Sequence, residues 1–450
     1  MAAGPEDPPR APRDRAPPDR AQGSLRMDRR GFLGAGLGAS VLGVVAARRA
    51  AGGALPEQPA MREAGAPFSN YGRPSPSEKD IVRWIAANPG APGNGVSWCP
   101  LHELEGIVTP NGLHFERHHN GVPRIAPEDH RLLVHGLVER PLVFRVADLL
   151  RYPLRSRLCF LECGGNSNAG WHRRPVQAPA GYVHGLVSCS EWTGVPLATV
   201  LAETGIRGGA SWLVAEGADA FAMNVSIPLA EARRDALLAL YQNGERLRPE
   251  NGYPLRLLLP GREGVLNVKW LRRLQLSDRP IMARNETSRY TELLPSGKAR
   301  QFTGIMEVKS LLLAPSAGMS LPGPGLYQLS GLAWSGRGRI RRVEVSVDGG
   351  RQWQEAALEG PSLPCCFTRF RHPWRWRGGP AVLQSRALDE SGAWQPERAA
   401  LLAEHGRHGY FHYHAIVSWQ VEEDGTVRSV YGDAGGGGSA APADIGEDWF

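Results

Sequence analysis

The residue best suited to chemistry is Cys163, which follows a short apolar run. Residues 157–168 read R-L-C-F-L-E-C-G-G-N-S-N, and the apolar first half predicts a buried strand. Two glycines after Cys163 allow a sharp turn and the close approach of a bulky group. Cysteine is often simply buried, but this glycine-rich break and the polar residues after it favour a metal ligand, since a thiolate is a soft donor. Cys159, inside the run, is interpreted as a small buried hydrophobic residue.

The sequence around this loop predicts both helices and strands. Residues 101–305 combine strand-like apolar runs, short helical segments and glycine- and proline-rich breaks, which predicts a mixed α/β domain whose breaks converge on one pocket. Residues 306–432 instead predict an all-β sandwich of immunoglobulin type, because R-V-E-V-S-V-D at 342–348 alternates strictly and Asp348-Gly349 signals a hairpin. The expected fold class is α+β, with the two domains in this order.

The N-terminal segment predicts export. Arg29 and Arg30 precede Phe-Leu and a weakly apolar, glycine- and alanine-rich run at 34–47, as in a twin-arginine signal. We therefore expect the protein to be exported to the periplasm already folded. A membrane anchor is the alternative, but a spanning helix needs about 20 strongly apolar residues, so no stable membrane span is expected. The segments outside the two domains are assigned as an N-terminal extension and signal region (1–54), an extended arm (55–100) and a flexible tail (433–450).

Composition argues against several other classes. The net charge is +7, but much of the basic excess lies near the N-terminus and no block of Lys and Arg is interleaved with aromatic residues, which argues against nucleic-acid binding. The six cysteines show no disulfide spacing, and no C-x-x-C-H occurs, so this chain carries no c-type haem. Cys365-Cys366 is interpreted as incidental. His412 and His414, on one face of a predicted strand, are too few for a structural zinc site and are interpreted as sheet surface or interface.

Four segments, in the same order within roughly residues 100–425, resemble the sulfite oxidase family of molybdenum enzymes. Cys163-Gly-Gly-Asn166 resembles its C-A-G-N, in which the cysteine binds molybdenum. The other three are H-F-E-R-H at 114–118, the run from Y-P-L-R at 253–256 to N-V-K-W-L at 267–271, and Tyr290. In addition, V-E-V-S-V-D-G-G at 343–350 resembles the start of the family's dimerisation domain. The resemblance implies a sulfite-oxidase-type molybdopterin domain followed by a dimerisation domain.

The resemblance also implies roles for individual residues. Cys163 would ligate molybdenum, and Arg117 and Tyr290 would complete the catalytic set. The residues implied to bind the molybdenum–molybdopterin cofactor are Phe115, Glu116, Arg117, His118, Asn251, Arg256, Asn267 and Lys269. Arg256 and Lys269 suit the phosphate of the cofactor, one as a bidentate donor and the other as a point charge. Taken alone, Arg117 is equally compatible with a surface ion pair, and Tyr290 with a half-buried packing residue.

Departures from the family bear on the substrate. Ser167 and Asn168 stand where sulfite oxidases have two arginines that help to hold sulfite, and Asn251 replaces a histidine. Residues 185–194 and 410–419 are most similar to the sulfane dehydrogenase subunit of the bacterial sulfur-oxidising (Sox) system. The resemblance thus implies oxidation of sulfane sulfur on a carrier protein, with electrons passing to a c-type cytochrome. The alternatives are a sulfite dehydrogenase acting on free sulfite and, from another class, a non-catalytic periplasmic binding protein.

The C-terminal domain carries the prediction on assembly. The resemblance implies a homodimer through this domain, within a two-plus-two complex that includes the cytochrome. Three tryptophans of the predicted sandwich, Trp374, Trp376 and Trp419, are compatible with two roles. They either form the dimer interface or fill the core of the sandwich.

Overall fold

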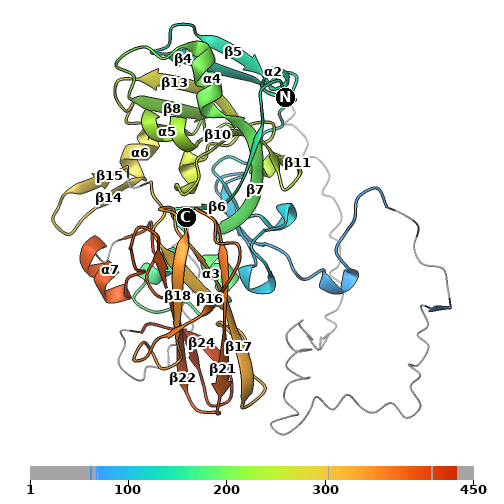
Figure 1. Cartoon of the computed structure of the whole chain (residues 1–450), viewed down its shortest axis with the longest axis vertical. Helices are drawn as coiled ribbons and strands as arrows, with labels where there is room; N and C mark the ends of the chain where they lie inside the picture. Colours follow the sequence, from blue (N-terminus) through green and yellow to red (C-terminus); the bar gives the residue numbers. More distant parts are fainter. Residues whose placement is uncertain (1–60, 63–66, 68, 303, 407–408, 433–450) are drawn as a thin grey trace, which may run out of the picture.

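Two lobes make up the structure, a computed structural model that describes residues 61–62, 67, 69–302, 304–406 and 409–432. The predicted signal region at 1–54 and the predicted tail at 433–450 lie outside the described residues. Figure 1 shows a first lobe of mixed helices and strands and, below it, a second lobe dominated by strands, so the α+β fold class is confirmed. Within the described part of the chain, no helix has the length and apolar character that crossing a membrane requires.

The first lobe is built on two five-stranded sheets. Their strands are β4 (Arg131–Gly136), β5 (Leu142–Arg145), β6 (Arg155–Glu162), β7 (Val187–Pro196), β8 (Trp212–Gly217), β9 (Asn224–Pro228), β10 (Leu237–Gln242), β11 (Glu245–Arg246), β12 (Arg256–Leu258) and β13 (Leu271–Ser277). One sheet has the order β5-β4-β13-β8-β9, with only β4 and β13 parallel among its described pairs. The other has the order β11-β10-β7-β6, and β12 pairs with β10.

Short helices cover the sheets of this lobe. They are α2 (Val146–Leu149), α4 (Leu197–Thr204), α5 (Leu229–Asp235) and α6 (Arg284–Ser288), whereas α3 (Ala180–His184) lies near the second lobe (Figure 1). In α4, Leu197, Val200, Leu201 and Thr204 are buried. This spacing of i, i+3, i+4 and i+7 places one face of the helix on the core. The apolar core of the two sheets therefore includes residues of α4 and α5.

Two edges of the first lobe carry the segments with functional motifs. β6 becomes fully buried toward its end, and Cys163 begins the loop that follows, as predicted. Cys159, inside β6, is fully buried. A three-stranded antiparallel sheet of β1 (Trp84–Ala87), β2 (Gly95–Trp98) and β3 (Glu116–His118) brings residues 116–118 to the same region. The segment at 55–100 thus supplies two strands of this sheet.

The second lobe is a sandwich of two antiparallel sheets. Its strands are β16 (Lys309–Ala314), β17 (Gly325–Trp334), β18 (Ile340–Ser346), β19 (Gln354–Glu355), β20 (Ala357–Glu359), β21 (Thr368–Trp376), β22 (Ala381–Asp389), β23 (Ser418–Val421) and β24 (Val427–Val430). They form sheets of order β16-β17-β21-β20 and β19-β18-β22-β23-β24. Trp374, Trp376 and Trp419 are all buried in the core of this lobe, so the core-filling interpretation of these tryptophans holds.

One apolar core joins the lobes. Phe160 and Leu161 of β6 belong to the same buried cluster as Leu311 of β16 and Trp334 of β17. Phe160 stacks parallel to Phe367 with ring centroids 6.5 Å apart. The hairpin of β14 (Thr291–Leu293) and β15 (Ala299–Gln301) and the helix α7 (Arg398–His405) flank the junction, where β6 also lies (Figure 1). The end of β6 is therefore held from both lobes.

Candidate active site

The loop after β6 is fixed by hydrogen bonds on both sides of the thiol. The Cys163 N–H donates to the Leu186 carbonyl at 2.9 Å, and the Asn166 N–H donates to the Cys163 carbonyl at 2.9 Å. The Asn166 side chain accepts from the Leu186 N–H at 3.0 Å and donates to Glu162 Oε1 at 2.8 Å. Burial raises the pKa of the Cys163 thiol to about 11. Burial alone therefore favours the neutral thiol, whereas a bound metal cation would favour the thiolate.

Cys163 opens into a cleft whose empty volume is about 800 Å³, part of it open to solvent. Almost every site residue expected from the sequence lines this cleft: Cys163, Arg117, Tyr290, Phe115, His118, Asn251, Arg256, Asn267 and Lys269. The exception is Glu116, which forms an ion pair with Arg83 and accepts from His118 Nε2 at 2.7 Å. Glu116 therefore lies behind His118 and orients its ring.

Two buried cations face the cleft without a carboxylate partner among the described residues. Arg256 donates to the carbonyls of Asn251 (2.9 Å) and Asn267 (2.8 Å), and its Nε–H has no partner in this part of the chain. Lys269 Nζ contacts His118 Nδ1 at 2.7 Å and the Arg117 carbonyl at 3.1 Å. Burial lowers the pKa of both cations, and the charge of Arg256 lowers that of Lys269 further. An anionic group in the cleft would stabilise both charges.

Histidines add neutral polar groups to the same wall. Burial, and then nearby cations, lower the pKa of His118 and of His119 to about 3, so both rings are neutral at pH 7. Lys269 donates to His118 Nδ1, which leaves the proton on Nε2 for Glu116. His114 Nε2 and Asp219 Oδ1 also line the cleft and find no partner among the described residues. His119 and Asp219 were not among the predicted site residues, because neither lies in a recognisable motif.

Arg117 and Tyr290 stand at the thiol end of the cleft. Arg117 donates to Asn94 Oδ1 at 2.8 Å and to the His118 carbonyl, and it pairs with no carboxylate in the described residues, so it is not a surface ion-pair residue. Burial, and then the charges of Glu263 and Cys163, raise the pKa of Tyr290. The phenol therefore stays protonated and can donate a hydrogen bond. Tyr290 also packs, since its ring stacks on Phe411 at 5.3 Å.

Comparison with known proteins decides the family. Residues 119–285 match the oxidoreductase molybdopterin binding domain, and residues 300–418 match the Mo-co oxidoreductase dimerisation domain. Sulfite oxidase of Gallus gallus is 33% identical over 327 residues, which cover 66% of this chain and 70% of that protein. The chain belongs to the sulfite oxidase family of molybdopterin oxidoreductases. Its cofactor is molybdenum–molybdopterin, and the cleft fits this group, because it offers a soft thiol at one end and unpaired buried cations elsewhere.

Two further relatives differ in how much of their length they share with this chain. Nitrate reductase of Betula pendula is 32% identical over 355 residues, but this chain spans only 38% of the length of that protein. Among solved structures, the sulfane dehydrogenase SoxCD from Paracoccus pantotrophus matches with a TM-score of 0.80 and 42% identity. That match covers 83% of this chain and 97% of the SoxCD chain. Both lobes are thus represented in one solved relative.

The two positions that replace the family's arginines are both buried. Ser167 is 1% exposed, and its Oγ accepts from Lys309 Nζ at 2.5 Å and lies 2.6 Å from His184 Nδ1. Ser167 is therefore committed to the lobe junction and does not line the cleft. Asn168 is also buried, and its side chain lies near Tyr410. The side chain of Asn251 donates to Gln242 Oε1 at 2.9 Å, and its backbone carbonyl accepts from Arg256 Nη1 at 2.9 Å.

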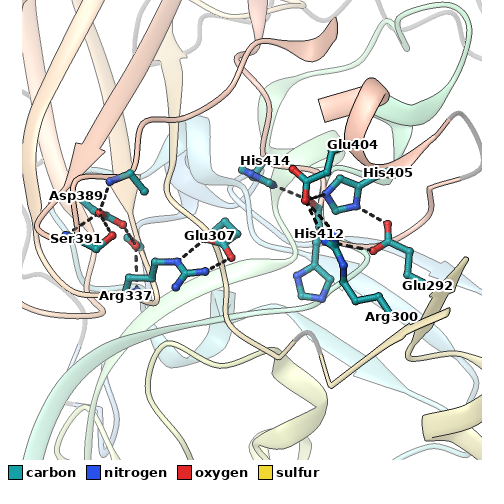
Figure 2. A network of polar contacts seen from close by, with 12 residues as sticks. Glu292, Arg300, Glu307, Arg337, Asp389, Ser391, Glu404, His405, His412 and His414 are labelled. Carbon is teal, nitrogen blue, oxygen red and sulfur yellow. Dashed lines mark hydrogen bonds and ion pairs between the residues drawn. The ribbon is translucent and has the colours of Figure 1, made fainter. Parts of the chain in front are cut away.

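His412 and His414 do not lie on a strand, which corrects the prediction from sequence. His412 has a φ of 56° and its N–H donates to the Gly164 carbonyl at 2.8 Å, so the segment runs as a loop over the Cys163 turn. His414 Nδ1 lies 2.9 Å from the His412 carbonyl, and Figure 2 shows both rings in a polar network at the lobe junction. In the described chain, no three His, Cys, Asp or Glu residues are grouped as a metal site. Cys366, expected to be incidental, is buried 3.5 Å from Cys189 in the shared core.

Proposed function

We propose that this chain is the molybdenum subunit of a periplasmic sulfane dehydrogenase, which oxidises sulfane sulfur held on a cysteine of a carrier protein. The observation that carries the proposal is the 42% identity to SoxCD across 97% of that chain. The sequence supports it, because Ser167 and Asn168 stand where sulfite oxidases have two arginines that help to hold sulfite. A carrier-bound sulfur has less negative charge to neutralise than free sulfite.

Several residues of the cleft would then bind the cofactor or hold the residues that bind it. Cys163 ligates the metal through its thiolate, and Arg256 and Lys269 bind the phosphate of the pterin. His118 holds the Lys269 ammonium in place, with Glu116 fixing the tautomer of His118. When bound, the cofactor accepts the two electrons that sulfur loses as it gains oxygen.

Arg117 and Tyr290 act on the substrate side. Their N–H and O–H groups donate to the oxygen that sulfur acquires, and both lie at the thiol end of the cleft. Each turnover adds one oxygen atom from water to the sulfur and releases two protons and two electrons. The chain contains no C-x-x-C-H motif to bind a c-type haem, so the electrons pass to a separate c-type cytochrome. A homodimer through the second lobe, with one cytochrome on each copy, gives the two-plus-two complex.

Free sulfite is the second candidate substrate, because sulfite oxidases match the chain at 33% identity. The two are distinguished by reduction of a c-type cytochrome with either sodium sulfite or a carrier protein that bears a cysteine persulfide. We expect a higher kcat/KM for the carrier-borne sulfur. A clear preference for sulfite would reject the proposal in favour of a sulfite dehydrogenase. Protein made with ample cofactor but lacking molybdenum would instead support a non-catalytic binding protein.

Export is tested separately. Cell fractionation with the twin-arginine pair intact should place the protein in the periplasm. Arg29→Lys with Arg30→Lys should retain it in the cytoplasm, because the signal depends on the paired arginines. Periplasmic accumulation of this double variant would contradict export by the twin-arginine route.

A further inference from the structure

A segment of the second lobe lies across the loop that carries Cys163. The His412 N–H donates to the Gly164 carbonyl at 2.8 Å, which fixes the segment from Tyr410 to His412 over the turn. Next to this bond, His412 Nε2 lies 3.5 Å from Glu263 Oε2. Close by, His405 of α7 pairs with Glu292 of β14, and Arg300 of β15 lies 3.1 Å from Glu404, as Figure 2 shows. The segment from Tyr410 to His412 is thus bonded to the Cys163 loop and lies next to the ion pairs of the lobe junction.

Gly165 keeps a space open between this segment and the thiol. A β-carbon at position 165 would lie 3.9 Å from Cys163 Sγ, 3.9 Å from Phe411 Cε1 and 3.9 Å from Tyr410 Cε1. The absence of a side chain therefore leaves a gap with sulfur on one side and two aromatic rings on the other. Glycine is not required here by a left-handed backbone, because the φ of Gly165 is not in that region. The gap itself is the structural consequence of this glycine.

The rings around the gap support one another. Phe411 stacks on Tyr290 with centroids 5.3 Å apart and an interplanar angle of 24°. Tyr410 meets Phe411 edge to face at 4.8 Å. Tyr410 is 45% exposed and lies near the buried Asn168, so it extends from the buried loop to solvent. These contacts join three aromatic rings beside the thiol, of which Tyr410 reaches solvent.

A buried carboxylate lies beside the gap, with His412 as its partner. Glu263 is buried, and its Oε1 would lie 1.9 Å from a β-carbon at Gly164, directly beside the Cys163 turn. This oxygen has no hydrogen-bond partner within the described residues. Arg117 supplies positive charge to the cleft, but Asn168 and the aromatic rings are neutral. A narrow sulfur group with less negative charge thus enters the space beside the Glu263 carboxylate at lower electrostatic cost than a dianion does.

We propose that Tyr410, Phe411 and Tyr290 form an aromatic collar that admits an extended peptide arm bearing sulfur and selects it over a free sulfur oxyanion. This inference rests on the proposed function, because it names the groups that give the site its preference. Aromatic rings can pack along a peptide backbone and its thioether-like sulfur. The gap at Gly165 lies directly beside the Cys163 thiol that the sulfur-bearing residue must approach.

Substitutions at the gap test the collar with two substrates. Gly165→Ala narrows the gap, and Phe411→Ala removes one of its walls. Each variant should lower kcat/KM for a synthetic peptide bearing a cysteine persulfide by roughly 10-fold or more. For sodium sulfite, Gly165→Ala should change kcat/KM by less than about 3-fold, since sulfite is small. Phe411→Ala also removes the ring that stacks on Tyr290, so its effect is compared as the ratio of the losses for the two substrates. Gly208→Ala is the matched control, because a β-carbon at Gly208 meets nothing within 4 Å.

A binding measurement separates the collar from the chemistry. Calorimetric titration with an inert peptide, in which S-methylcysteine replaces the persulfide, should show weaker binding to Gly165→Ala and Phe411→Ala than to Gly208→Ala. Molybdenum per chain should be equal in all variants. Equal losses for persulfide peptide and sulfite, or unchanged binding of the inert peptide, would overturn the collar. If the unmodified enzyme fails to oxidise the persulfide peptide while the inert peptide still binds through the collar, the proposed substrate is wrong and the collar stands.

Discussion

Removal of the Lys309 ammonium tests how the second lobe supports the Cys163 loop. Lys309 is 1% exposed and donates to Ser167 Oγ at 2.5 Å and to the Tyr413 carbonyl at 3.0 Å. It also lies 3.4 Å from Glu162 Oε1, on the residue just before Cys163. Glu162 accepts from Trp334 Nε1 at 2.7 Å as well. Lys309→Met fills the same volume but leaves the buried carboxylate without its counter-charge.

The cost follows from this burial. Removing one partner of a buried ion pair destabilises a protein by roughly 3–5 kcal/mol. Glu162 keeps hydrogen bonds from Trp334 and Asn166, so we expect Lys309→Met to cost about 3 kcal/mol, at the low end of that range. Glu162→Gln should cost a similar amount, because it leaves the ammonium buried alone. In the double variant both charges are gone, so its cost should fall well below the sum of the two single costs.

Urea unfolding followed by tryptophan fluorescence measures these differences, with molybdenum content matched between samples. Lys298→Met is the control, because Lys298 is exposed on the turn between β14 and β15. If the costs of the single variants simply add in the double variant, the pair is not electrostatically coupled. If Lys309→Met is as stable as Lys298→Met, the Glu162 carboxylate does not depend on Lys309.

Further predictions concern the cleft itself. Cys163→Ser should abolish activity and hardly change the circular dichroism spectrum, because the loop lies outside the strand ladder; inactivation by Cys159→Ser with an active Cys163→Ser would reassign the ligand. Lys269→Met should reduce the molybdenum retained per chain after gel filtration, and unchanged retention would show that Lys269 does not bind the phosphate. Burial lowers the pKa of Lys269, so between that lowered value and the ordinary pKa of about 10.4 the unfolded chain binds more protons than the folded one. The unfolding temperature of cofactor-free protein should therefore rise with pH in this window, more than that of the loaded protein, and equal slopes would refute the assignment. Asn168→Arg should raise kcat/KM for free sulfite relative to the carrier-borne sulfur, whereas an unchanged ratio would mean that this position does not face the substrate.

Local sequence was enough to predict residues that the structure brings together in one cleft. Cys163 follows a strand and precedes two glycines, and Arg256 and Lys269 lie in short motifs of their own. These features are local, so each was readable without knowledge of the fold. The same reasoning placed Glu116 in the cleft, but Arg117 and His118 are the residues of β3 that line it. Glu116 pairs with Arg83 and accepts from His118 Nε2, so it lies behind His118, and neither partner could be inferred from the motif itself.

Features that depend on packing between the lobes were not readable. Y-F-H-Y-H has the alternation of a strand, yet its backbone bonds to Gly164 and its His412 adopts a positive φ. Ser167 has a φ of 65°, which turns its side chain toward Lys309, 142 residues away. Such contacts form only when distant segments meet, and no local periodicity reports them.

These contacts make the second lobe part of the active site as well as a dimerisation domain. It supplies the ammonium of Lys309 and the indole N–H of Trp334 to the residue before Cys163, and Phe411 to the space beside the thiol. Its core is continuous with Phe160 and Leu161 of β6. Cutting the chain between the lobes would therefore expose that core and leave Glu162 without Lys309 and Trp334. For this reason the dimer must be tested by sedimentation of surface variants of the complete chain, because a truncated protein would lose the support of the Cys163 loop together with the interface.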